Sequence, residues 1–170
     1  MQALHWLLAA LILFMLGLGL YMVELEQDPG RKFELYQLHK TLGAWVFLLT
    51  AVRALVRIGT ASPAYPDAMP DWQRHAGKSA HVLIYALTFT MGVTGYVMIS
   101  SSPLPLPIDF AGGVQVPNLI APDYALSEQM KAVHHQLAWV FLALLALHIL
   151  AALKHHFWDR DRVLRQMLPF

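Results

Sequence analysis

The chain has 170 residues, of which 57% are hydrophobic and 14% charged, with a net charge of +1 and a mean hydropathy of +0.47. A soluble domain of this length would carry a much larger charged fraction. The sequence contains no cysteine, which excludes disulfides, thiolate zinc sites, iron–sulfur clusters and covalent attachment of a cofactor through C-x-x-C-H.

Four apolar runs follow one another along the chain, each long enough to cross a hydrocarbon core of about 30 Å. They lie at about 3–23, 38–58, 79–100 and 133–155. The first run lacks the basic n-region and the small-residue cleavage site of a secretory signal, so we expect it to be retained. The sequence therefore predicts a single all-α domain over residues 1–170, a multi-pass transmembrane four-helix bundle surrounded by membrane lipid.

The basic residues divide unevenly between the two sides of this bundle. Eight follow the second span or lie in the C-terminal tail: Arg53, Arg57, Arg74, Lys78, Lys154, Arg160, Arg162 and Arg165. The opposite side has four (Arg31, Lys32, Lys40 and Lys131), together with seven of the eleven acidic residues. The positive-inside rule therefore predicts that both termini are cytoplasmic. The proline- and glycine-rich segment 101–132 then faces outward and is expected to fold back as a cap over the helix ends.

Histidines occur at corresponding ends of the predicted spans. The first span begins LHW and places His5 near the cytoplasmic face, and the second begins LHKTLG and places His39 near the outer face. The third carries His81 near its cytoplasmic end. The fourth runs inward, so that His134 lies near the outer face and His148 toward the cytoplasmic face. A histidine inside a spanning helix is a functional hypothesis by default, because an unpartnered ring nitrogen is costly in hydrocarbon.

The spacing of these histidines predicts cofactor sites at two depths. His134 and His148 are fourteen residues apart, about four turns at the 3.5-residue periodicity of a left-handed bundle, so both side chains point the same way. A rise of roughly 21 Å separates them. This arrangement pairs His39 with His134 near the outer face and His5 with His148 near the inner face. Helix bundles build cofactor sites from facing side chains, and two stacked, non-covalently bound haems, each with two imidazole ligands to iron, satisfy the pattern.

Arginine and glycine residues on the same helix faces are candidates for further haem contacts. Arg53 lies on the stripe of His39 at the level of the inner haem, where a cation can pair with a propionate. Gly19 lies at the level of the outer haem and Gly43 lies one turn from His39, and a missing side chain lets a macrocycle approach the backbone. Gly95 has the same candidate role. Small residues also help membrane helices to pack, so each glycine alone supports either interpretation.

Two other histidines are second choices for the inner site. His155 lies seven residues after His148 on the same stripe and could replace it opposite His5. His81 could be a ligand or a propionate contact. The tail KHHFWDRDR could present His155 or His156 as a hydrogen-bond donor to a quinone headgroup, or could simply anchor the chain to phospholipid headgroups.

Four motifs run in order along the chain: LHW, LHKTLG, HVLIY followed by GVTGYVM, and HHQLAWVF followed by LHILAALKHHFWDRDRVLRQML. Together they resemble the bacterial cytochrome b561 family over nearly the whole sequence. The resemblance implies a di-haem b-type cytochrome of the bacterial inner membrane, with iron ligands at His5, His39, His134 and His148. It also implies ubiquinone or another quinone as one redox partner. In one branch of the family superoxide is the other partner, which would make the chain a superoxide:ubiquinone oxidoreductase rather than only an electron carrier.

The expected function is outer-sphere electron transfer between a periplasmic-side donor and the quinone pool, because two imidazoles leave no iron position open to a substrate. Lys40 and Lys131 would attract anionic superoxide to the outer face, whereas the seven outer acids oppose this. A second hypothesis is a haem-bearing membrane subunit that exchanges electrons with a periplasmic redox protein docked on segment 101–132. A remote third is a metal or proton transporter, but the four spans contain none of the acidic residues that such proteins usually carry at the midplane. Nothing in the sequence predicts a nucleic-acid partner.

Overall fold

The computed structural model describes residues 1–25, 28–60, 65–66, 69–111 and 113–168. Its four long helices are α1 (Gln2–Glu24), α2 (Pro29–Ile58), α3 (Asp71–Ser100) and α4 (Tyr124–Lys154). A short antiparallel hairpin of β1 (Ile108–Ala111) and β2 (Val114–Val116) lies between α3 and α4. After α4 come a π-helical turn, η1 (His155–Asp159), and a 3-10 turn, η2 (Arg165–Met167). The predicted all-α architecture of four helices is confirmed.

All four helices are long and apolar enough to cross a membrane. Their most apolar windows have mean hydropathies of 2.4, 1.6, 1.8 and 2.2 along the chain, and at most 28% of any window is buried inside the protein. Most of the apolar side chains therefore face outward, as expected for helices surrounded by lipid. Lipid offers no hydrogen-bond partners, so a spanning segment must form its backbone hydrogen bonds internally, as a helix does.

Three helices begin well before the predicted spans, and in α2 and α4 a side-chain cap sets the start. Asp28 is the N-cap of α2, where its carboxylate accepts a hydrogen bond from the Arg31 backbone at 2.9 Å and Pro29 occupies the first turn. Asp123 caps α4 in the same way, accepting from the Leu126 backbone at 3.0 Å. Such caps satisfy backbone donors that no helical carbonyl reaches. The polar first turns therefore lengthen α2 and α4 at their N-terminal ends, beyond the apolar runs from which the spans were predicted.

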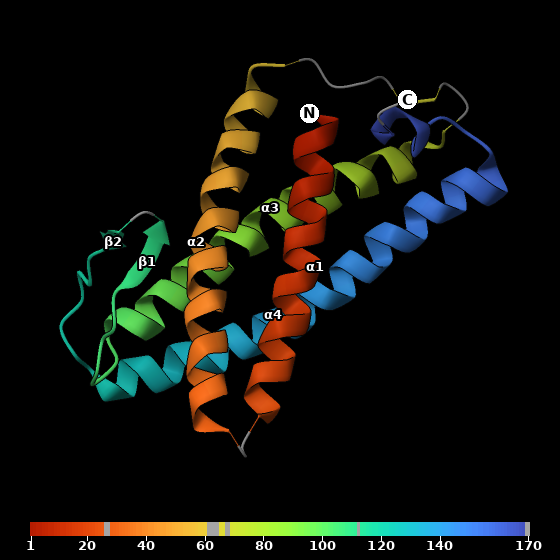
Figure 1. Cartoon of the computed structure of the whole chain (residues 1–170). Helices are drawn as coiled ribbons and strands as arrows, with labels where there is room; N and C mark the ends of the chain where they lie inside the picture. The colour runs from red at the N-terminus through yellow and green to blue at the C-terminus, as the bar shows by residue number, and fades with distance from the viewer. Residues whose placement is uncertain (26–27, 61–64, 67–68, 112, 169–170) are drawn as a thin grey trace.

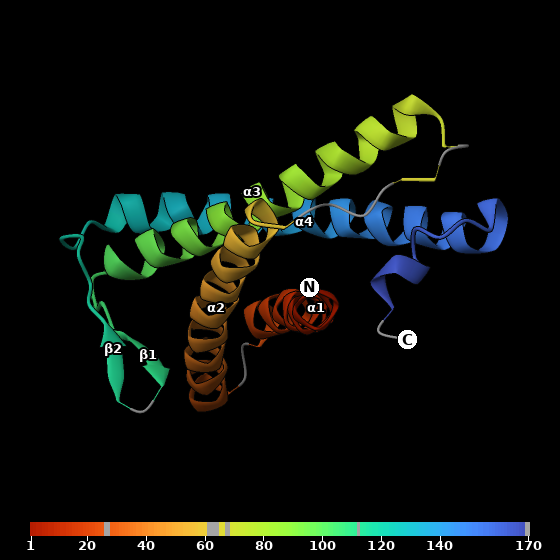
Figure 2. The ribbon, with the colours of Figure 1, turned by 90° about the horizontal axis from the view of Figure 1, so that it is seen from above.

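The four helices form two antiparallel hairpins that cross at an angle. In both views α3 lies alongside α4, and α1 pairs with α2 in a separate hairpin (Figures 1 and 2). Both chain ends lie at the same end of the bundle, where the Trp6 indole donates to the Met167 carbonyl at 2.7 Å and the Gln2 amide donates to the Gln166 carbonyl at 2.9 Å. We call this the termini end, and the end that carries β1 and β2 the hairpin end.

The hairpin is fastened to the side of α2. The Thr41 hydroxyl donates to the Asp109 carbonyl at 2.7 Å, and the Trp45 indole donates to the Phe110 carbonyl at 3.0 Å. The rings of Trp45 and Phe110 also stack, with centroids 4.3 Å apart. The connection after α3 thus folds back against the bundle, although its last residues, from Tyr124 onward, belong to α4.

Where α2 meets α3, a glycine accommodates an aromatic ring. A Cβ atom at Gly92 would overlap the Phe47 ring. Phe47 also meets Phe89 edge-on, with centroids 5.3 Å apart. The missing side chain at Gly92 thus lets α2 and α3 pack closely at this point.

Candidate functional site

Two histidines from different helices meet near the hairpin end. His39 belongs to α2 and His134 to α4, and their ring centroids are 6.4 Å apart with the ring planes at 75°. The structure therefore brings together the outer pair that the spacing predicted, on two different helices and within reach of one shared ligand.

The second nitrogen of each ring has a different environment. The Nδ1 of His134 lies 3.1 Å from the Thr94 hydroxyl of α3. The Nδ1 of His39 is buried and has no hydrogen-bond partner among the residues that the structure describes. Buried polar atoms are rarely left in this condition. One ring nitrogen of the pair therefore has a bonding capacity that the described part of the protein does not satisfy.

Two glycines allow the rings to lie directly against helix backbones. A Cβ atom at Gly19 of α1 would be 3.3 Å from His39 Cε1, and one at Gly95 of α3 would be 3.3 Å from His134 Cε1. A side chain at either position would have to displace the imidazole. The sequence predicts that Gly19 makes room for a cofactor at this level, and the group that it faces is the His39 ring. Gly43 faces Met15 instead, with a Cβ-to-Cε distance of 3.5 Å.

A large cavity lies beside the pair. Its volume is about 590 Å³, and both His39 and His134 line it. Its walls come from all four helices and both strands and are mainly apolar, with Phe47, Phe141 and Ile108 among them. Cofactor pockets commonly measure about 300–1,000 Å³ and combine apolar walls with a few well-placed polar groups. A wide apolar space lined by two imidazoles fits a haem bound through its iron.

Three histidines and an arginine converge toward the termini end. His81 of α3 and His148 of α4 are in edge contact, with ring centroids 5.6 Å apart. His5 of α1 is within electrostatic range of both histidines and of Arg53. The Nδ1 of His5 and the Nε of Arg53 are buried without hydrogen-bond partners in the described part of the chain, while the Arg53 guanidinium lies 5.7 Å from the centre of the Tyr85 ring. The structure thus groups His5, His148 and Arg53, as expected, and adds His81 as a close neighbour.

His155 is engaged by carboxylates of the tail. Its Nδ1 lies 2.6 Å from an Asp161 oxygen and 3.2 Å from an Asp159 oxygen, and Lys154 contacts the same Asp159 oxygen at 2.6 Å. Arg160, in a left-handed conformation with φ 53°, closes the turn. These contacts favour a role in the tail over the alternative of an iron ligand.

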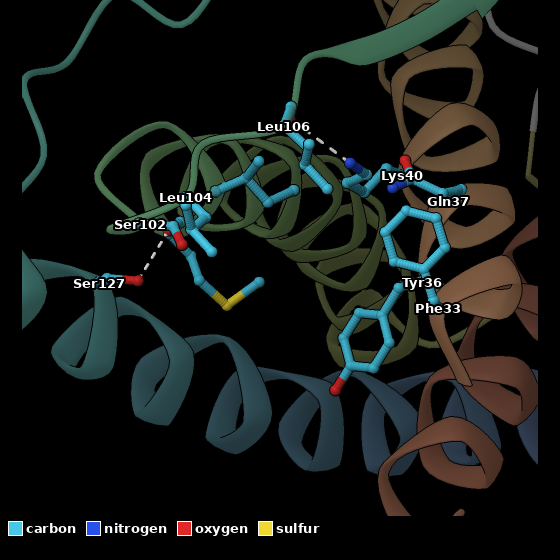
Figure 3. A pocket seen from close by; sticks show the side chains of 10 residues that line it. Phe33, Tyr36, Gln37, Lys40, Ser102, Leu104, Leu106 and Ser127 are labelled. Carbon is cyan, nitrogen blue, oxygen red and sulfur yellow. Dashed lines mark hydrogen bonds between the residues drawn. The ribbon is translucent and has the colours of Figure 1, made fainter. Parts of the chain in front are cut away.

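A smaller pocket of about 210 Å³ adjoins the cavity at the hairpin end (Figure 3). Tyr36 and Lys40 line both spaces. The Lys40 ammonium lies 3.4 Å from the carbonyls of Leu106 and Pro107, long distances that leave it weakly engaged. Lys131, the other cation expected near this site, pairs with Glu128 at 3.4 Å. Lys40 is therefore the basic side chain placed to act on a ligand entering this pocket.

Thr94 and Gly92 are functional candidates that sequence reasoning missed. Neither stands out as a residue type, because threonine and glycine are common in membrane helices. The sequence does contain one indication of Thr94: it is next to Gly95, which the sequence predicts to be close to a cofactor site. The contact of Thr94 with His134 depends on the register between α3 and α4, which one sequence does not reveal.

The chain matches the family described as prokaryotic cytochrome b561 over residues 1–170. It is 32% identical over 166 residues to cytochrome b561 homolog 2 of Escherichia coli (strain K12), which covers 98% of this chain and 87% of the relative. Cytochrome b561 homolog 1 of the same organism is 24% identical over 131 residues, covering 77% and 73% of the two chains. A protein of Yersinia pestis named probable superoxide oxidase CybB is 26% identical over 173 residues, covering 97% and 91%. The chain therefore belongs to the prokaryotic cytochrome b561 family of membrane electron carriers, and b-type haem is its cofactor.

Proposed function

We propose that the chain binds two non-covalent b-type haems and carries electrons between a periplasmic-side donor and the quinone pool of the bacterial inner membrane. The observation that carries the proposal is the pair of neighbouring imidazoles, His39 and His134, which line an apolar cavity of about 590 Å³. The second haem is assigned to His5 and His148, with Arg53 as the contact for a propionate. Haem, when bound, supplies reversible one-electron exchange at a potential that ligands, burial and hydrogen bonds adjust.

The residues around the hairpin-end pair exclude water and fix the ligands. Phe47, Phe141 and Ile108 form part of the apolar wall. With His39 and His134 both holding the haem iron, a donor would exchange electrons at the edge of the site instead of binding the metal. Outer-sphere transfer requires little movement of the protein, which agrees with ligands held on helices and not on loops.

Superoxide is the donor that we assign to the hairpin end. A relative at 26% identity bears the name probable superoxide oxidase, and Lys40 lines a small pocket that adjoins the cavity. Each superoxide gives up one electron and becomes dioxygen. A quinone takes up two electrons and two protons to become a quinol, so two superoxide ions are consumed for each quinone. A weakly engaged cation near the site raises the local concentration of an anionic donor.

The acceptor is ubiquinone or another membrane quinone, and the tail after α4 is a candidate location for it. With Nδ1 of His155 engaged by Asp161 at 2.6 Å, Nε2 is left to meet a headgroup oxygen. The other interpretation, a basic anchor to phospholipid headgroups, is supported by the exposed Arg160 and Arg162. Replacing His155 by phenylalanine distinguishes the two, because only a quinone contact should raise the quinone concentration needed for half-maximal turnover.

The donor assignment is tested on the detergent-purified chain alone. We expect superoxide generated in solution to reduce the bound haem and then added quinone, and superoxide dismutase to abolish both changes. Lys40→Gln should slow haem reduction several-fold at low ionic strength, and added salt should shrink the difference. Lys131→Gln is the matched control, because Lys131 lies beside the Glu128 carboxylate and is not among the residues that line the pocket or the cavity.

Failure of superoxide to reduce the isolated chain would contradict this donor. Reduction only in the presence of a periplasmic redox protein would instead support the second hypothesis, a membrane subunit whose partner docks on the connection that contains β1 and β2. That hairpin lies against α2 and lines the cavity through Ile108, Phe110 and Val116, which places such a partner close to the site.

A further inference from the structure

Thr94 is a buried polar residue of α3 that touches the hairpin-end site. Its side chain is 7% exposed. The hydroxyl oxygen lies 2.8 Å from the Thr90 carbonyl, 3.1 Å from the Met91 carbonyl and 3.1 Å from His134 Nδ1. Thr94 is therefore the side chain that joins α3 to the ring of His134.

The direction of this hydrogen bond follows from counting protons. A threonine hydroxyl has one proton and can accept further hydrogen bonds, whereas a backbone carbonyl only accepts. The short contact to the Thr90 carbonyl uses the hydroxyl proton, a common arrangement for threonine within a helix. The hydroxyl oxygen then accepts from His134 Nδ1. The Met91 carbonyl, at 3.1 Å, is a second acceptor for the hydroxyl, so two carbonyls compete for its one proton and the ring nitrogen is left as the donor.

This contact fixes the tautomer of His134. With Nδ1 protonated, Nε2 carries the lone pair, and Nε2 is then the only nitrogen able to bind a metal. Gly95 holds the ring against the α3 backbone from the adjacent position. His39, by contrast, has no partner for its Nδ1 among the described residues. The two histidines of the pair therefore differ in how firmly they are oriented.

We propose that Thr94 is a positioning residue that orients His134 as the iron ligand and makes it the more basic of the two histidines at the hairpin-end haem. The inference rests on the proposed ligation by His39 and His134. A ligand that donates its other N–H to an acceptor is fixed in orientation and gains basicity, and loss of such a contact commonly costs ten- to a hundred-fold in metal affinity or activity. A more basic ligand favours the oxidised iron, so the Thr94 contact lowers the reduction potential of one haem.

The test is an optical redox titration of the purified, haem-loaded chain, with low-temperature electron paramagnetic resonance of the oxidised form. Thr94→Val removes the hydroxyl at nearly constant shape. We expect it to raise the potential of one haem, by about 59 mV for each tenfold change in relative affinity for the two oxidation states, and to alter the resonance of that haem alone. Thr94→Ser should restore both values, since it keeps the hydroxyl. Thr90→Val is the matched control, because the Thr90 hydroxyl donates to the Ala86 carbonyl of its own helix and not to a histidine of the described site.

Unchanged potentials and unchanged resonance in Thr94→Val, with both haems retained, would overturn the inference and leave the ligand assignment intact. If Thr94→Val does not yield folded protein, Thr94→Ala removes the same hydroxyl with a smaller side chain and is judged by the same criteria. The ligand assignment is tested separately, by the haem content of His134→Ala. Full haem content in that variant would contradict the assignment.

Discussion

Gly19 and Gly95 bring backbone, instead of side chains, against the two rings of the hairpin-end site. Each would place a Cβ atom 3.3 Å from the Cε1 of a histidine, closer than side chains normally pack. The histidines lie where they do because these positions on α1 and α3 carry no side chain. Ligand geometry at this site is thus determined by residues that contribute no functional group of their own.

Gly19→Ala should weaken binding of one haem and leave the other unaffected. The added methyl must push the His39 ring by a few tenths of an ångström, and overpacking of this kind costs about 1–3 kcal/mol. The measurement is haem retention during dilution in detergent. Gly17→Ala is the control, because a Cβ atom at Gly17 meets nothing within 4 Å. Equal haem retention in the two variants would contradict the role assigned to Gly19.

The termini-end site has one more histidine than two axial positions require. His81 contacts His148 directly at 5.6 Å between centroids, while the pairing proposed for the second haem is His5 with His148. We expect His5→Ala to lose this haem, and His81→Ala to keep it with a shifted reduction potential, because His81 would act as a polar neighbour. Haem content and redox titration of both variants check this. The reverse outcome would make His81 the ligand.

At the scale of elements, the β-hairpin completes the wall of the cavity. It is held to α2 by the Thr41 and Trp45 hydrogen bonds and by the stacking of Trp45 on Phe110. Two short strands are marginal alone in water, so the hairpin depends on this attachment. Opening it would expose the cavity to solvent from the hairpin end.

Trp45→Phe should loosen the hairpin without removing its aromatic contact. The lost hydrogen bond to the Phe110 carbonyl is worth about 1 kcal/mol, so local opening should rise about five-fold. Hydrogen exchange of the amides of β1 and β2 measures this opening. Trp72→Phe, at a 69% exposed side chain, should leave exchange unchanged. Identical exchange in both variants would mean that the hairpin is held in another way.

The helices and the outer histidine pair could be predicted from sequence, and the details of their surroundings could not. Apolar runs and heptad spacing are properties of one helix at a time, so His134 and His148 could be placed on one face of the fourth span in advance. The hairpin has strands of four and three residues, too short for an alternating pattern to be recognised. The contacts of Thr94 with His134 and of His81 with His148 depend on the register between α3 and α4. Sequence periodicity alone does not fix that register.

At the scale of the whole molecule, an even number of spanning helices returns both chain ends to one end of the bundle (Figure 1). Eight of the twelve basic residues lie in the last turns of α2, in the first turns of α3, at the end of α4 or in the tail after it. This distribution predicts that the termini end faces the cytoplasm and the hairpin end the periplasm.

Sidedness can be tested with single cysteines, because the chain has none of its own. In intact spheroplasts, a membrane-impermeant maleimide should label Val114→Cys in the hairpin, whose side chain is 62% exposed. Arg162→Cys in the tail should be labelled only after the membrane is permeabilised. The opposite labelling pattern would show that the orientation is inverted, and the hairpin end would then face the cytoplasm instead of the periplasmic superoxide donor.

The most direct test of the central claim is the haem content of the detergent-purified chain, measured as pyridine haemochrome against quantified protein. Two b-type haems per chain are expected, with His39→Ala and His148→Ala each losing one and His135→Ala, outside both histidine clusters, losing none. No haem, or a single haem indifferent to both ligand substitutions, would contradict the two-site account.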